Sequence, residues 1–344
     1  MANYQVGNYV FDLKRFFPDS VFAAITETRV NSPEVILQEA KARKRRKKLT
    51  RDGKLTILAA DHPGRMVTRS GDDPIGMCDR QEYLGRVLRV VTNPEVDGIM
   101  ATTDVIEDLF IVNHLVRQGG GPSFLDEKVM LGSMNRGGLS GTKFEMDDTF
   151  TSFSVESLRL LRLDAAKTML RLELSSADSA KTMLYNAQII SELNRNEIPC
   201  FFEILYVSPE GFKVQKTPAE MMKAIGVAAA MGDSSRNLWL KIPFCEDYAR
   251  VVKSTTLPLL MLGGESKGDP TGTIAEFVAG LKAGSNVRGA LVGRNILFPG
   301  KDDPLATALA VNQVVHAGAS KEEAVDYLMA NRDIRMDALT RYIR

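Results

Sequence analysis

Cysteine is scarce in this chain, with only three residues among 344. Cys78, Cys200 and Cys245 are widely separated and show no short paired spacing. Small domains held together by disulfides carry dense, closely spaced cysteines and belong to oxidising compartments. The sequence therefore excludes a disulfide framework and indicates a reducing compartment.

Histidine is equally scarce, and His62, His114 and His316 lie far apart in the sequence. Neither an HxH nor an HExxH spacing occurs. Zinc sites in enzymes draw largely on histidines, often at such short spacings. We therefore expect no histidine-rich zinc site, and we predict no metal ion and no cofactor.

Long apolar runs and an excess of charge of one sign are also missing. No stretch reaches the roughly 18 apolar residues of a membrane-spanning helix, and the N-terminus lacks a continuous apolar segment of the signal-peptide type. Lys and Arg total 44 against 43 Asp and Glu, a balance that favours neither nucleic acid nor an anionic membrane as a partner. We expect a cytoplasmic protein that does not interact with membranes.

One basic cluster departs from this balance, KARKRRKKL at residues 41–49. No aromatic residues are interleaved with its lysines and arginines, although aromatic side chains are common in segments that bind single-stranded nucleic acids. We interpret the run as a solvated basic face of a helix.

Short apolar runs alternate with longer amphipathic segments from about residue 55 onward, in a chain with 44% hydrophobic and 25% charged residues. Eight of these runs are expected to form buried strands: residues 55–61, 97–104, 128–135, 164–174, 198–206, 237–244, 257–264 and 287–295. Helix-like segments between them include residues 178–196, 217–231 and 271–284. Thr217 followed by Pro218 is typical of a helix start, and Gly284 of a helix end.

Eight strands separated by helices predict an α/β fold, a (β/α)8 TIM barrel with N-terminal and C-terminal helical extensions. We expect residues 1–50 to form helices that cover the bottom of the barrel, residues 51–317 to form the catalytic barrel, and residues 318–344 to form one or two helices outside it. The extensions offer apolar surface, which favours a homo-oligomer. The least regular part, residues 136–163, begins with a glycine-bearing loop long enough to line a site.

Four expected strands carry ionisable residues, and barrel enzymes build their sites at the C-terminal ends of the strands. Asp61 ends the first strand, while Lys167, Glu203 and Lys241 lie in the fourth, fifth and sixth. Helices cover the outer face of such strands, so an outward charge there would be desolvated without a partner. We therefore expect all four side chains to point into one central cavity.

A lysine buried among apolar neighbours has the chemistry of an imine former. Burial disfavours the ammonium form of Lys241, and a second cation such as Lys167 disfavours it further. A neutral amine can attack a ketone, and the protonated imine then acts as an electron sink. Glu203 could move protons in these steps, and Asp61 could orient Lys241 or bind Arg65. A structural ion-pair network of buried lysines and carboxylates remains the alternative.

The last two expected strands end in glycine-bearing motifs, LGGES at residues 262–266 and VGRNI at residues 292–296. Loops after strands seven and eight of many barrels bind phosphate through backbone N–H groups. The candidate phosphate-binding residues are Gly263, Gly264, Gly293 and Arg294.

Two further arginines, Arg65 and Arg136, lie in the loops after the first and third strands. Either could bind a substrate carboxylate or phosphate, and a surface position is the alternative for both. His62, next to Asp61, is interpreted as a supporting loop residue.

Five segments, in this order and spacing, resemble the bacterial class I aldolases that include tagatose bisphosphate aldolase: DAAKTMLRL, PCFFEILY, LWLKIPF, LLMLGG and ALVGRNILF. The wider superfamily includes the archaeal-type fructose bisphosphate aldolases and the deoxyribose-phosphate aldolases. The similarity covers roughly residues 55–315. It implies a Schiff base on Lys241, catalytic roles for Lys167 and Glu203, and a phosphate site at the two glycine-bearing loops. The DHPG stretch that begins at Asp61 resembles the first-strand aspartate motif of the fructose bisphosphate branch.

The chain departs from both branches at two places. Where the fructose bisphosphate branch has an aromatic pair and a proline-arginine-glycine turn, this chain has Glu203, Leu205 and the stretch SPEG at residues 208–211, which leaves Tyr206 open as an acid catalyst. The first loop, DHPGRM, is not the glutamine-bearing loop of the tagatose enzymes.

The chain is most similar to barrel aldolases encoded with inositol-degradation genes. This resemblance implies cleavage of 2-deoxy-5-keto-gluconate 6-phosphate to dihydroxyacetone phosphate and malonate semialdehyde. The expected partner is thus a small phosphorylated sugar. Two alternatives stay open: a Schiff-base lyase or transaldolase-like enzyme on another sugar, and a non-catalytic barrel that binds sugar phosphates.

Overall fold

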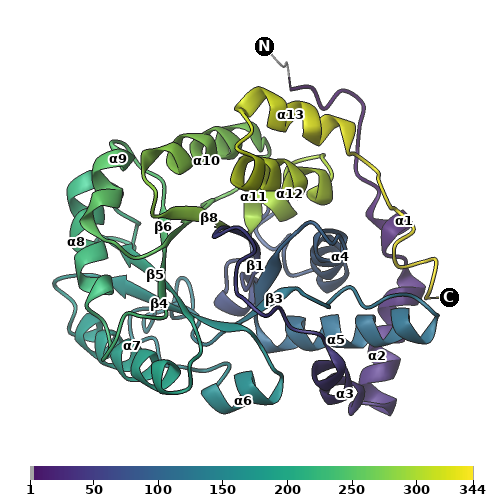
Figure 1. Ribbon diagram of the computed structural model, residues 1–344, viewed down its shortest axis with the longest axis horizontal. Coiled ribbons are helices and arrows are strands. Elements are labelled where there is room, and N and C mark those ends of the chain that lie inside the picture. Colours follow the sequence, from purple (N-terminus) through teal and green to yellow (C-terminus); the bar gives the residue numbers. More distant parts are fainter. Residues whose placement is uncertain (1–3, 344) are drawn as a thin grey trace.

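The computed structural model describes residues 4–343, and its centre is a closed barrel of eight parallel strands (Figure 1). Each strand pairs with its neighbours in the sequence, and β8 pairs with β1 to close the barrel. The strands are β1 (Leu55–Ala60), β2 (Gly98–Ala101), β3 (Val129–Ser133), β4 (Ala165–Leu172), β5 (Cys200–Tyr206), β6 (Leu238–Pro243), β7 (Leu259–Leu262) and β8 (Val287–Val292). Every predicted apolar run contains one of these strands, so the predicted barrel is confirmed.

Side chains alternate between the interior of the barrel and the helices outside it. Large apolar side chains fill the lower interior; among them the rings of Phe201 and Trp239 stack with centroids 5.4 Å apart. Glu203 and Lys241 lie two residues further along β5 and β6, on the same interior face, and are register partners. The packed lower layer thus supports charged side chains near the C-terminal ends of the strands.

Helices surround the barrel and cover its outer face (Figure 1). They are α4 (Arg80–Val91), α5 (Thr103–Gln118), α6 (Val155–Leu160), α7 (Ala177–Arg195), α8 (Pro218–Ala229), α9 (Tyr248–Val251), α10 (Thr271–Ala283), α11 (Arg294–Leu297) and α12 (Pro304–Asn312). The predicted start of α8 is confirmed, because Thr217 caps the helix in a reciprocal capping box with Glu220 and Pro218 is the first helical residue. None of the helices in residues 4–343 has the length and apolar character needed to cross a membrane.

Three helices precede the barrel: α1 (Leu13–Phe16), α2 (Asp19–Asn31) and α3 (Val35–Ala42). We expected these helices to cover the bottom of the barrel, but α1 packs against α4, and α2 and α3 pack against α5. Helices α1, α2 and α3 therefore pack on the outer faces of α4 and α5, at the side of the barrel, as Figure 1 also shows.

The basic run 41–49 covers the bottom of the barrel instead. Arg43 pairs with Asp164, just before β4, with Nη1 3.0 Å from Oδ2, and Arg46 pairs with Asp97, just before β2, at 2.8 Å. The side chains of both arginines are almost fully buried. Our interpretation of the run as a helix face is wrong, because the chain leaves α3 at Arg43 and crosses the N-terminal ends of the strands. The lysines Lys44, Lys47 and Lys48 are exposed, as expected for a solvated segment.

The C-terminal part of the chain is joined to the same end of the barrel. His316, in the short helix η3 (Gln313–Ala317), lies with Nδ1 2.8 Å from Asp52 and Nε2 2.8 Å from Asp97. Lys54 donates to the carbonyl of Val315 at 2.7 Å. These contacts tie the segment that enters β1 to the segment that follows α12.

Beyond η3, helix α13 (Lys321–Ala330) is followed by turns up to Tyr342. The N-terminal segment runs beside this region (Figure 1): Tyr4 donates to Asp302 at 2.9 Å, and Arg332 donates to the same carboxylate at 2.7 Å. On α4, Arg89 makes a two-pronged ion pair with Asp303, with N–O distances of 3.0 and 2.7 Å, and both side chains are fully buried.

Candidate active site

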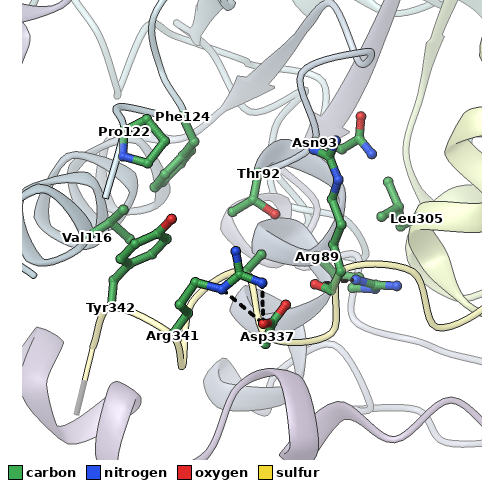
Figure 2. A pocket seen from close by; sticks show the side chains of 12 residues that line it. Arg89, Thr92, Asn93, Val116, Pro122, Phe124, Leu305, Asp337, Arg341 and Tyr342 are labelled. Atoms are coloured by element: carbon green, nitrogen blue, oxygen red, sulfur yellow. Dashed lines mark hydrogen bonds and ion pairs between the residues drawn. The ribbon is translucent and has the colours of Figure 1, made fainter. Parts of the chain in front are cut away.

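The described residues form several cavities of about 340–550 Å³, and two of about 370 Å³ are candidates for the functional site. One lies between α4, α5 and the C-terminal segment, and Figure 2 shows the Arg341–Asp337 ion pair at it. It is lined by arginines but by no lysine among the described residues. The other cavity opens at the C-terminal ends of the barrel strands and is lined by both Lys241 and Glu203. Barrel enzymes carry their chemistry at this end, so the second cavity is the candidate active site.

Four charged side chains form an alternating row under this cavity. The ammonium of Lys167 lies 3.0 Å from Asp61 Oδ2 and 3.1 Å from Glu203 Oε2, and Lys241 donates to the same Glu203 oxygen at 2.9 Å. Ser133 donates a further hydrogen bond to Asp61 at 3.2 Å. The structure thus brings together the four residues that the sequence singled out on four different strands or their ends.

Burial separates the row into two levels. Lys167 and Asp61 are 0% and 1% exposed, whereas Glu203 and Lys241 line the cavity although each is only 4% exposed. A ligand in the cavity therefore meets the Lys241 amine and the Glu203 carboxylate, while Lys167 contacts Glu203 from below and is itself held by Asp61.

The row sets the protonation of its members. Burial lowers the pKa of Lys241, and the ammonium of Lys167 lowers it further, against the opposing effect of the Glu203 carboxylate. Burial alone would raise the pKa of Glu203, but the ammonium groups of Lys241 and Lys167 outweigh it and bring the pKa to about 2. The site therefore combines a carboxylate with an amine that releases its proton more easily than an ordinary lysine.

The four candidate phosphate-binding residues all line the cavity: Gly263, Gly264, Gly293 and Arg294. Asn295 donates to the carbonyl of Gly263 at 2.6 Å, which joins the loop after β7 to the loop after β8. A side chain at position 293 would be crowded, because a Cβ atom there would lie 2.3 Å from Cε1 of His62 and 2.5 Å from the carbonyl oxygen of Ala59. The two loops form one wall of the cavity, on the β7 and β8 side.

The two other candidate arginines are placed differently. Arg65 lies in the cavity wall, with Nη1 3.8 Å from Asp61 Oδ2. Arg136 instead donates from Nε to Thr151 at 2.9 Å and is not among the described residues that line the cavity. Tyr206 lies on the other face of β5 from Glu203 and packs against the outer hydrophobic core. The structure therefore brings Arg65 to the site and does not bring Arg136 or Tyr206.

Sequence reasoning missed Arg171, which also lines the cavity. It lies four residues after Lys167 on β4 and therefore on the same interior face. Its guanidinium pairs with Glu145, in the glycine-bearing loop after β3. The alternation of side chains along the strand could have identified this residue.

His62 lies deeper in the wall than the sequence indicated. Burial lowers the pKa of His62 to about 3, and the nearby guanidinium groups of Arg294 and Arg65 contribute to the lowering. The imidazole is therefore neutral near pH 7. No group of three or more His, Cys, Asp or Glu residues that could hold a metal ion occurs within residues 4–343.

The Cgl0159-like family model matches residues 53–315, the barrel with its lead-in and part of η3. The chain belongs to the Cgl0159-like family. The crystal structure of Cgl0159 from Corynebacterium glutamicum is 35% identical, with a TM-score of 0.80, and the match covers 88% of this chain and 98% of that one. No curated protein matches the chain.

This Cgl0159-like chain also shares its barrel with fructose-bisphosphate aldolases. The enzyme from Slackia heliotrinireducens is 17% identical with a TM-score of 0.61, and the match covers 92% of this chain and 95% of that one. A Schiff-base-forming fructose-1,6-bisphosphate aldolase is 20% identical with a TM-score of 0.53, over 82% of this chain and all of the other. At these identities the similarity shows the shared barrel fold.

Proposed function

We propose that this protein is a class I aldolase that cleaves a phosphorylated ketose or keto-sugar acid through an imine on Lys241. The observation that carries the proposal is the contact of 2.9 Å between a buried Lys241 amine and the Glu203 carboxylate, in a cavity at the catalytic end of the barrel. The shared fold with Schiff-base-forming aldolases supports the same reaction class.

The chemistry begins with the free amine of Lys241, which attacks the ketone carbon while the carbonyl oxygen takes up a proton. The resulting carbinolamine loses water once its hydroxyl is protonated. Glu203 is within reach of the nitrogen proton and can carry it to the departing hydroxyl. Since the Lys241 ammonium helps to hold the pKa of Glu203 down, loss of that charge makes the carboxylate a better proton acceptor when it is needed.

Carbon–carbon cleavage follows from the iminium. Removal of the proton from the β-hydroxyl of the substrate releases an aldehyde, and the bonding electron pair moves into the iminium to give an enamine. Protonation of the enamine and hydrolysis of the imine return the Lys241 amine and the second product. Lys167 lies between the two carboxylates, where it keeps Asp61 and Glu203 ionised and disfavours a second ammonium at Lys241.

The substrate phosphate is assigned to the wall formed by Gly263, Gly264, Gly293 and Arg294, where glycines allow backbone N–H groups to approach an anion. A specific candidate substrate is 2-deoxy-5-keto-gluconate 6-phosphate, which would yield dihydroxyacetone phosphate and malonate semialdehyde. Its keto group and its phosphate fit the roles of Lys241 and this wall.

Reduction with borohydride in the presence of dihydroxyacetone phosphate tests the proposal. We expect one stable adduct by intact mass, located on Lys241 by peptide mapping and missing in Lys241→Met. Lys128 is an internal control, because burial lowers its pKa to about 7 at the opposite end of the barrel, away from this cavity. An adduct on Lys128, or none on Lys241, would show that the assignment is wrong.

A further inference from the structure

A second cationic wall faces the cavity on the β4 side. Arg65, in the turn η1 (Pro63–Arg65) after β1, extends its guanidinium to β4, where Nη2 lies 3.4 Å from Met169 Sδ. Arg171 projects from β4 two residues after Met169. Both arginines line the cavity, with side chains only 9% and 12% exposed.

The guanidinium of Arg65 has weak partners for a buried cation. Nε donates to the carbonyl of Arg136 at 3.1 Å, and the other contacts are the thioether of Met169 and Asp61 at 3.8 Å. Asp61 is already held by Lys167 at 3.0 Å. A guanidinium has five N–H donors, and leaving a buried charge short of partners is costly unless a ligand supplies them.

Arg171 already holds one carboxylate, that of Glu145 from the loop after β3. The same loop meets Arg65, because Ser140 N donates to the carbonyl of Arg65 at 3.1 Å and Ser140 lines the cavity. Burial lowers the pKa of Arg171 to about 10, and the charge of Arg65 contributes to the lowering. The two guanidinium groups therefore repel each other across a space where an anion would relieve the repulsion.

The order of strands places this wall opposite the loops after β7 and β8. In the closed barrel β4 lies four strands from β8, and β6, which carries Lys241, lies midway between them. An anion at each wall would hold a substrate across the cavity with its middle over Lys241.

We propose that Arg65 and Arg171 form a second anion-binding subsite, so that the substrate carries two anionic groups, one on each side of the carbonyl that reacts with Lys241. The inference rests on the proposed aldolase function and narrows its substrate class. The second group is a carboxylate or a phosphate, since both accept paired N–H donors from a guanidinium. The Glu145 carboxylate occupies part of this subsite in the structure.

The test compares ketones that differ only in the second anion. Imine formation is measured by borohydride trapping with fructose 1,6-bisphosphate against fructose 1-phosphate, and with a phosphorylated keto-sugar acid against its alcohol counterpart. We expect at least one probe with two anionic groups to half-saturate the wild-type protein at about 10- to 100-fold lower concentration than its matched probe with one anionic group. The pair that shows the preference identifies the second group. Equal half-saturating concentrations for the two members of each pair would overturn the proposal of a second subsite.

The variant Arg171→Gln distinguishes two possible roles of Arg171, binding of the second anionic group and stabilisation of the loop after β3. We expect it to abolish the preference for the probe with two anionic groups and to change the half-saturating concentration of the probe with one anionic group by no more than about twofold. A uniform loss for both members of a pair would show that Arg171 only holds the loop, and would overturn the proposal.

Two variants serve as matched controls. Glu145→Gln removes the carboxylate that competes for Arg171, so the probe with two anionic groups should bind at least as tightly as it binds to the wild type. A loss of preference in Glu145→Gln like that in Arg171→Gln would count against the subsite. Arg136→Gln removes an arginine from the same loop whose side chain bonds to Thr151 outside the cavity, and the preference should persist.

Different experimental results would contradict the second subsite and the aldolase function. If dihydroxyacetone phosphate forms no adduct on Lys241, the proposed function itself is wrong. If that adduct forms while no probe with two anionic groups is preferred, only the second subsite is wrong.

Discussion

Removal of the Lys167 ammonium should lower stability with little change in side-chain volume. In Lys167→Met the apolar side chain occupies a similar volume, but the ammonium that lies 3.0 Å from Asp61 and 3.1 Å from Glu203 disappears. Glu203 keeps its contact with Lys241 at 2.9 Å. Among the described residues, Asp61 keeps only the hydroxyl of Ser133 at 3.2 Å and the guanidinium of Arg65 at 3.8 Å. The variant therefore leaves one buried carboxylate without an adequate counter-charge.

The size of the effect follows from that single uncompensated charge. At an effective dielectric constant of about 20, two unit charges 3.0 Å apart attract by about 5 kcal/mol. Removing one partner of a buried pair typically costs about 3–5 kcal/mol. With about 2.1 cal/mol/K of unfolding entropy per residue over 344 residues, this corresponds to a fall in Tm of about 4–7 °C.

The pH dependence distinguishes this explanation from simple loss of packing. Burial alone would raise the pKa of Asp61, but the charges of Lys167 and Arg65 hold it well below its ordinary value, so the carboxylate stabilises the fold above its unfolded pKa of about 4. In Lys167→Met burial dominates and the pKa rises above the unfolded value. Asp61 then takes up a proton on folding as the pH falls, and the loss of stability should shrink between pH 7 and pH 4.5.

Calorimetric melting of the wild type and the variant at both pH values checks the prediction. The double variant Lys167→Met/Asp61→Asn should recover part of the lost stability at pH 7, because it removes the unpaired charge. A fall in Tm below about 1 °C, or an equal fall at both pH values, would refute the reasoning.

Two further predictions concern the cavity, one its wall and the other the reactive amine. Gly293→Ala should lower stability by about 1–3 kcal/mol, since its Cβ would lie 2.3 Å from His62, whereas Gly226→Ala in α8, where no atom lies within 4 Å, should be neutral or stabilising; thermal melting compares the two. The rate of imine trapping should rise with pH, because only the neutral amine of Lys241 reacts, and should level off below the ordinary lysine pKa of 10.5. In Lys167→Met the rise should move to higher pH, since a neighbouring cation is lost; a profile identical to that of the wild type would contradict the role of Lys167.

The barrel and the charged row were predictable because both follow from periodicities of the sequence. Eight apolar runs mark eight buried strands, and alternation along β5 and β6 places Glu203 and Lys241 on one face. A charge on a strand covered by helices has only the interior to face, which is why four separate residues could be assigned to one cavity.

The loops and the ends of the chain could not be predicted in the same way, because their contacts depend on segments far away in the sequence. Arg65 and Arg136 are both loop arginines, yet one guanidinium reaches β4 and the other bonds to Thr151. The basic run likewise gives no local sign that Arg43 and Arg46 will be buried against Asp164 and Asp97, which are more than 50 residues away.

The Arg89–Asp303 pair has a consequence for how the chain folds during synthesis. Its two members are 214 residues apart, so at about 5–20 residues per second the carboxylate follows the guanidinium out of the ribosome by about 10–40 s. Until then the guanidinium of Arg89 on α4 has no buried carboxylate as a partner. Removing it from water costs free energy, which disfavours packing of the early helices around it. We therefore expect the helices around Arg89 to pack stably only after the segment that carries Asp303 has been synthesised.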